Sequence, residues 1–89
     1  MTYTHESHSE IIKRLKRADG HLQKIIAMID QGKPCLDVAQ QLQAVYKAIG
    51  NAKGVFVQDH IEGCLSGNTN SPSELRSMMK EIREISKYL

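Results

Sequence analysis

The stretch from Pro34 to about Leu65 constrains the fold most strongly, because no proline and no cluster of turn residues interrupts it. Its apolar residues recur at steps of three and four, the period of a helix, and no part of the chain alternates apolar and polar residues over a useful length. The sequence therefore predicts one long central helix and no sheet. A chain of 89 residues buries only a limited core on its own, so we expect it to gain stability by oligomerising.

Two further helical segments flank the long one. Residues 7–10, Ser-His-Ser-Glu, have the spacing of a capping box, and Gly32, Lys33 and Pro34 end the first segment. Residues 71–74, Ser-Pro-Ser-Glu, repeat the box after a loop at 66–70. The expected apolar faces consist of Ile11, Leu15, Leu22, Ile25, Ile26 and Ile29 in the first helix and Leu75, Met78, Met79, Ile82, Ile85 and Leu89 in the third. We expect an all-α, three-helix protomer in a single domain over residues 1–89, with residues 1–6 disordered.

Composition and the N-terminal pattern narrow the functional class. No apolar run reaches about 18 residues, so no membrane span is expected. The first residues lack the basic and apolar regions of a secretory signal. Two cysteines in such a chain indicate a cytoplasmic protein with reduced thiols, where metal binding or redox sensing outranks a structural disulfide. The sequence has no phosphate-cradling glycine loop and no evident nucleophile triad, so an enzyme is not expected.

Three residues of the central helix are candidate metal ligands. His60 and Cys64 are four residues apart, one turn along the same helix face. Such pairs also arise by chance, with a partly exposed histidine beside a buried cysteine, so the pair alone does not define a site. Cys35 precedes Cys64 by 29 residues, and at about 100° per residue it lies within about 20° of the same stripe.

The three candidates cannot meet within one straight helix, since its rise separates Cys35 from Cys64 by roughly 43 Å. An antiparallel second copy places its Cys35 end beside the His60 and Cys64 end of the first, and a two-fold dimer then forms two such sites. The crossing point falls near Gly50, among small residues that permit close approach. Glycines there indicate either close packing or a bend, and a break would weaken this phase argument.

Two thiolates and one imidazole form a soft, three-ligand set that suits Cu(I). Structural Zn(II) needs a fourth ligand, which His5, His8 or a carboxylate is able to supply. The competing chemistry is redox, because Cys35 and Cys64 of opposing chains can form a disulfide.

The net charge is only +2, but basic residues cluster in the first third of the chain. A local basic stripe can bind phosphates even when the total charge is nearly balanced. His8 and His21 are interpreted as surface residues. The cluster consists of Lys13, Arg14, Lys16, Arg17 and Lys24.

Taken together, Cys35 and the His60-x-x-x-Cys64 pair on a long second helix resemble the copper-sensitive operon repressor (CsoR) family. The resemblance covers essentially the whole chain, and the combination of its pieces is quite specific. The other matching segments are Arg14-x-x-Arg17-x-x-Gly20, Gln40-Gln41-Leu42, and Gly54 before Asp59-His60.

The resemblance implies a three-helix protomer, an antiparallel helical dimer, and a dimer of dimers. It also implies a repressor that leaves operator DNA when its ligand binds. In the copper subgroup, the residues matching Cys35, His60 and Cys64 bind Cu(I) across the dimer interface. Related subgroups respond to nickel or cobalt, to formaldehyde, or to persulfides.

Subgroup positions favour the copper sensors. Nickel and cobalt members carry histidines where Tyr3 and Cys64 stand here, and formaldehyde members carry Pro at Thr2 and Glu at Cys64. Persulfide-sensing members typically lack the equivalent of His60. His5 lies two positions from the nickel-ligand position and remains an additional candidate, with Ni(II) or Zn(II) as alternative metals.

For the basic cluster, the resemblance favours contact with phosphates over the alternative interpretation, an ordinary solvated helix face. Arg14 and Arg17 are the strongest candidates, because arginine forms bidentate phosphate contacts, and Lys13, Lys16, Lys24 and Lys53 extend the surface. A ligating histidine usually donates its other N–H to an acceptor. Glu81 is our candidate for that acceptor of His60, and Tyr46 is a weaker one.

The leading interpretation is a Cu(I)-responsive repressor of copper-resistance or efflux genes that binds operator DNA when metal-free. A sensor of nickel or cobalt, persulfide or formaldehyde from the same family is the first alternative. A metal-buffering protein with no role on DNA and a plain helical interaction module are the others.

Overall fold

The computed structural model describes residues 7–65 and 71–89, without the side chains of residues 64 and 65. It contains three helices, α1 (Ser7–Asp30), α2 (Cys35–Leu65) and α3 (Pro72–Ile85), and a 3-10 turn, η1 (Ser86–Tyr88). The described residues include no strand, and the predicted all-α, three-helix fold is confirmed. None of these helices is both long and apolar enough to cross a membrane. The disorder predicted for residues 1–6 concerns a segment outside the described residues.

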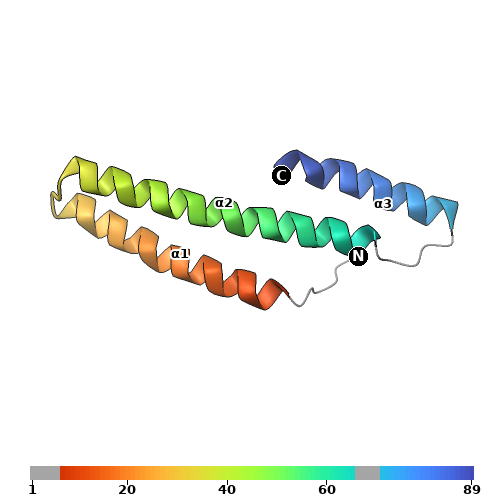
Figure 1. Cartoon of the computed structure of the whole chain (residues 1–89), viewed down its shortest axis with the longest axis horizontal. Helices are drawn as coiled ribbons and strands as arrows, with labels where there is room; N and C mark the ends of the chain where they lie inside the picture. Colours follow the sequence, from red (N-terminus) through yellow and green to blue (C-terminus); the bar gives the residue numbers. More distant parts are fainter. Residues whose placement is uncertain (1–6, 66–70) are drawn as a thin grey trace.

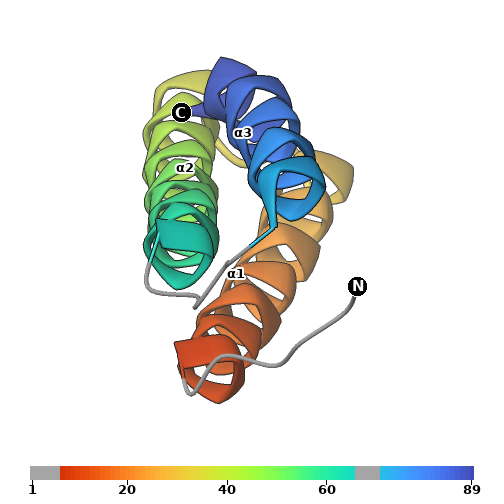
Figure 2. The same ribbon diagram turned by 90° about the vertical axis from the view of Figure 1, so that its right-hand side faces the viewer.

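The helices form an elongated, open arrangement rather than a closed bundle. α1 and α2 make an antiparallel hairpin, and α3 folds back along the C-terminal half of α2 (Figures 1 and 2). The protomer measures 59 × 23 × 14 Å. α2 is therefore the spine of the molecule, with α1 packed along it and α3 beside its second half.

The turn between α1 and α2 fixes the position of Cys35. Gly32 has φ 71°, which favours glycine, and its amide and that of Lys33 donate to carbonyls of the last turn of α1 at 3.1 and 2.9 Å. This is a Schellman motif, and it satisfies the orphan carbonyls of α1. The carbonyl of Pro34 accepts from the amide of Val38 at 3.1 Å. Cys35 is consequently the first residue of α2.

Of the capping residues predicted for the other two helices, the one for α3 is confirmed and the one for α1 is wrong. Ser71 caps α3, and its Oγ accepts from the amide of Glu74 at 3.5 Å, as the sequence predicts. The capping role expected for Ser7 is wrong, because Ser7 already lies within α1. Its hydroxyl donates to the carboxylate of Asp59 in α2, so it joins two helices instead of capping one.

α2 continues without interruption through Gly50 and Gly54. A Cβ added at either glycine would meet no atom within 4 Å in this protomer. The break considered from the sequence is therefore wrong. Neither glycine is explained by packing inside the chain; Gly50 is exposed and Gly54 is half-buried.

The core between α1 and α2 is small. Its centre is Ile25, which is 1% exposed, packed with Ala18, Val38 and Val45. Much of the predicted apolar surface lies outside it, a result that the helical period alone did not anticipate. The exposed members of the α1 stripe are Leu15, Leu22, Ile26 and Ile29, at 38–59% exposure, and those of α2 include Leu36, Leu42, Tyr46, Ile49 and Phe56, at 41–73%.

Candidate metal centre and nucleic-acid interface

Both ends of α2 carry candidate ligands. Cys35 is an exposed, free cysteine at the first residue of the helix. His60 lies near the other end, and Cys64 follows one turn later, with its side chain outside the described residues. The 25 residues from Cys35 to His60 correspond to a rise of roughly 38 Å. The protomer therefore does not bring them together, and no three metal-ligating side chains converge among the residues whose side chains are described.

His60 is held by α3. Its Nε2 lies 2.7 Å from Oε1 of Glu81, and the two side chains are 19% and 53% exposed. Because the carboxylate accepts the hydrogen bond, it places a proton on Nε2 and makes Nδ1 the lone-pair nitrogen of the neutral ring. The structure thus brings Glu81 to the atom where the sequence analysis expected an acceptor. The packing of α3 on α2 positions it there.

The two other candidates near the metal ligands are not brought to them within the protomer. Tyr46 is 73% exposed and lies 14 residues before His60, a rise of roughly 21 Å. It shares the helix stripe of Cys35, which is 11 residues away. His5 lies outside the described residues.

The start of α1 packs against the His60 end of α2. His8 stacks on Phe56 with ring centroids 5.2 Å apart and planes at 17°, and Nε2 of His8 is buried. Next to this stack, the hydroxyl of Ser7 donates a hydrogen bond to Asp59. Asp59 is the residue directly before His60 in the sequence. Interpreting His8 as a surface residue is wrong, since its side chain is half-buried. No local motif indicated these contacts, which join residues 48 and 52 positions apart.

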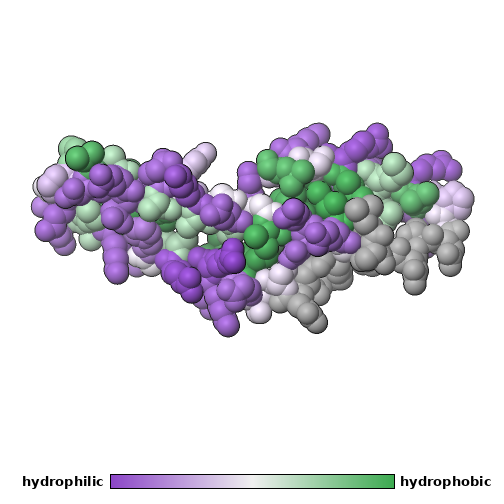
Figure 3. All heavy atoms as spheres, viewed as in Figure 1, coloured by the Kyte–Doolittle hydropathy of each residue, from purple (hydrophilic) through white to green (hydrophobic). Residues whose placement is uncertain are grey.

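The stripe of α2 that carries Cys35 and His60 also carries exposed apolar residues. At about 100° per residue, Leu42, Tyr46 and Ile49 lie on this stripe, and they are 43%, 73% and 44% exposed. Figure 3 shows apolar side chains at the surface along α3 and the adjoining part of α2, whereas polar side chains cover most of α1 in this view. An apolar face of this kind in a small protein marks an interaction surface.

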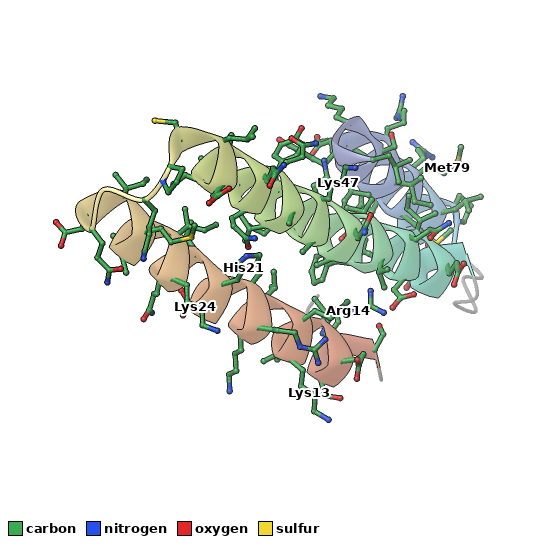
Figure 4. The ribbon with its side chains drawn as sticks, turned by 60° about the vertical axis from the view of Figure 1, so that its left-hand side comes forward. Lys13, Arg14, His21, Lys24, Lys47 and Met79 are labelled. Carbon is green, nitrogen blue, oxygen red and sulfur yellow. The ribbon has the colours of Figure 1, made fainter. Side chains whose placement is uncertain are left out.

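A basic cleft of about 670 Å³ lies between α1 and α2. Four of the six predicted DNA-contacting residues line it, and Glu10 is the one acidic side chain among its lining residues. Lys13 projects from α1 without lining the cleft (Figure 4). Lys53 also lies apart, because its 18-residue spacing from Cys35 places it on the ligand stripe. The lining basic residues are Arg14, Lys16, Arg17 and Lys24.

One histidine of the cleft links its two walls. Nε2 of His21 in α1 donates to Oε1 of Gln41 in α2 at 2.6 Å. His21 lines the cleft together with the basic residues and points toward α2 (Figure 4). It is half-buried at the surface of the cleft, in agreement with its interpretation as a surface residue. Its partner lies 20 residues away, and local periodicity carries no signal for such a polar pair.

Comparison with known sequences identifies the family. Residues 7–89 match the model of metal-sensitive transcriptional repressors. The copper-sensing transcriptional repressor CsoR of Mycobacterium ulcerans is 42% identical over 55 residues, covering 62% of this chain and 47% of that protein. CsoR of Bacillus subtilis is 32% identical over 68 residues, covering 73% of this chain and 67% of that protein. The match thus spans about half the length of the first of these relatives.

Solved structures share the fold. The nickel-responsive transcriptional regulator InrS has a TM-score of 0.79 at 23% identity, with 100% of both chains covered. A variant of the formaldehyde-responsive regulator FrmR from Salmonella enterica serovar Typhimurium has a TM-score of 0.82 at 26% identity, covering 99% of this chain and 100% of that one. These are repressors and regulators rather than enzymes. The chain belongs to the metal-sensitive transcriptional repressor family, which is the copper-sensitive operon repressor (CsoR) family that its motifs resemble.

Proposed function

We propose that this protein represses copper-resistance or efflux genes by binding operator DNA in its metal-free form, and that Cu(I) binding releases it. The observation that carries the proposal is the unbroken course of α2. It keeps Cys35 and His60 on one stripe at opposite ends of the helix. Copper-sensing relatives at 32–42% identity support the choice of metal.

The site is completed by a second copy of the chain. The stripe that holds Cys35 and His60 also holds exposed apolar residues, whose burial favours association at about 25 cal/mol per Å². In an antiparallel pair, the exposed Gly50 lies at the crossing point and permits close approach. Each Cys35 then faces His60 and Cys64 of the other chain. Two such dimers assemble into the tetramer that we expect to bind DNA.

The donor set fits Cu(I). Two thiolates and one imidazole are soft ligands, and three of them satisfy Cu(I), whereas structural Zn(II) takes four. The carboxylate of Glu81 on Nε2 of His60 leaves Nδ1 as the ligating nitrogen and fixes the orientation of the ring. Bound Cu(I) supplies a positive charge and a fixed link between the two chains.

The DNA surface is the basic cleft, on the other side of the hairpin. Val45 of α2 is buried against α1, at about 80° to one side of the Cys35 stripe. Ala48, which lines the cleft, lies about 60° farther in the same direction. The cleft and the ligand stripe therefore flank the contact between α1 and α2 on opposite sides. DNA and the second copy can occupy the protein together, as a regulated repressor requires.

The switch is a linkage between the two surfaces. Metal shifts the equilibrium only by binding one arrangement of the chains more tightly than another. α1 carries most of the cleft, and its first turn is attached to the His60 end of α2 through the Ser7 bond to Asp59 and the His8 stack on Phe56. A change in the spacing of the two α2 helices is thereby passed to α1.

Anaerobic titration of Cu(I) into a complex of the protein with operator DNA tests the proposal. We expect Cu(I) to lower DNA affinity by a factor of about five to 150, the range typical of allosteric coupling. The Cys35→Ala variant should keep its DNA affinity and lose the response to Cu(I). Unchanged affinity at saturating Cu(I) contradicts the proposal. A response to Ni(II) alone assigns the protein to a different sensor within the family.

A further inference from the structure

Among the residues that line the basic cleft, His21 is the one titratable group whose charge changes near neutral pH. It lies between the two helices, with the basic side chains of α1 around it (Figure 4). A histidine in water titrates near pH 6.5, whereas lysine and arginine keep their charge up to about pH 10.

The ring is held in one orientation. Nε2 donates to Oε1 of Gln41 at 2.6 Å, so Nδ1 is the nitrogen that gains a proton when the ring becomes charged. Protonation consequently keeps the bond to Gln41 and adds a second donor and a full positive charge. A charge-assisted hydrogen bond to a phosphate oxygen is about twice as strong as a neutral one.

We propose that His21 is a phosphate-contacting residue of the cleft and that its protonation strengthens DNA binding at mildly acidic pH. The inference rests on the proposed DNA-binding function and adds a proton as a second input beside the metal.

The groups that face His21 favour this coupling. From α1 these are chiefly Arg17 and Lys24, with Arg14 and Lys16 farther along, and from α2 the uncharged Gln41, Ala48 and Asn51. Glu10, the acidic lining residue, is 11 positions and roughly 16 Å along α1 away. Phosphates that bind these cations bring negative charge beside His21, so DNA binding promotes proton uptake by its ring.

The sign of the effect follows from this coupling. Because the ring binds its proton more tightly in the complex, DNA affinity is highest at acidic pH, where the ring is charged with or without DNA. Affinity falls as rising pH removes the proton, and it is constant once the ring is neutral in the complex as well. A tenfold increase in proton affinity on DNA binding corresponds to about a tenfold change in DNA affinity for each His21 that contacts DNA.

Two substitutions isolate this effect. In His21→Gln the side chain can still donate to Gln41, but it is never charged, whereas His21→Lys is charged throughout. The assay measures affinity for a fluorescent duplex of about 30 base pairs by anisotropy, at about pH 5.5 and pH 8 in low salt. A duplex of mixed sequence is sufficient for this assay, because phosphate contacts do not depend on sequence. Histidines elsewhere in the chain contribute a background that all three proteins share.

We expect wild-type affinity to rise by about tenfold or more from pH 8 to pH 5.5, relative to either variant. The affinity of His21→Gln should change less between the two pH values than that of the wild type, and His21→Lys should bind tightly at both values. The His21 ring resonance should titrate at higher pH in the complex than in the free protein. An equal pH ratio in wild type and His21→Gln overturns the inference and leaves the proposed function standing. Absence of duplex binding at both values overturns both.

Discussion

Replacing Glu81 tests how α3 controls the metal centre. The carboxylate lies 2.7 Å from Nε2 of His60, and loss of such a partner lowers metal affinity about 10- to 100-fold. Glu81 is 53% exposed, so water and salt screen part of its charge. We therefore expect Glu81→Ala to weaken Cu(I) binding about tenfold, which is about 1.4 kcal/mol. Glu81→Gln keeps an accepting oxygen without the charge and should lose only about two- to threefold.

The assay is anaerobic competition against a colorimetric Cu(I) chelator, and it measures affinity per chain. Glu84→Gln is the matched control, because it removes the same charge three residues along α3 from a carboxylate that lines the same hollow beside η1 as Glu81, whereas the bond to His60 is made by Glu81. Its Cu(I) affinity should equal that of the wild type. Wild-type affinity in Glu81→Ala, or an equal loss in Glu84→Gln, refutes the argument that the contact with His60 orients the ring.

Three further outcomes follow from burial and exposure. Cys35→Ala should abolish tight Cu(I) binding and leave the helical circular dichroism and urea midpoint unchanged, because Cys35 is exposed; a lower midpoint contradicts this. Ile25→Ala removes a side chain that is 1% exposed and should cost about 2–5 kcal/mol in urea unfolding. The same change at Ile26, 59% exposed, should cost less at concentrations where the chain is monomeric, and equal losses argue against the α1 register. Ile49→Lys places a charge on the exposed α2 stripe and should shift sedimentation toward smaller species, whereas an unchanged assembly state removes this stripe from the interface.

The sequence predicted the helices well because their signals are local. The Ser71 cap of α3 and the proline-free course of α2 each depend on residues within a few positions of one another. The Schellman turn at Gly32 likewise follows from a glycine after an amphipathic run. The shared stripe of Cys35 and His60 is a consequence of helical phase, and it holds because α2 is unbroken.

How each helix is rotated about its own axis was harder to predict from the sequence than where the helix begins and ends. Periodicity shows that a helix has an apolar face, but not which part of a wide face meets the neighbouring helix. Ile25 and Ile26 are adjacent members of the predicted stripe, yet one is 1% and the other 59% exposed. The sequence analysis placed both in the same stripe because it did not separate packing within the chain from surface left for a second copy.

The contacts between distant polar residues were the least predictable. Glu81 was reached by chemical reasoning, because a ligating histidine requires an acceptor. The His21 bond to Gln41 and the Ser7 bond to Asp59 had no such requirement behind them. They depend on how far α1 is shifted along α2. The turn at Gly32 and the packing of Ile25 together determine this shift.

Complementation between two defective chains tests the central claim most directly. One chain carries Cys35→Ala, and the other carries His60→Ala with Cys64→Ala. In the antiparallel dimer, the intact Cys35 of the second chain faces the intact His60 and Cys64 of the first, while the other site loses every ligand. Heterodimers purified through two tags should therefore bind one Cu(I) tightly, against two for the wild-type dimer and none for either variant alone. Absence of tight binding in the heterodimer contradicts a site shared between chains.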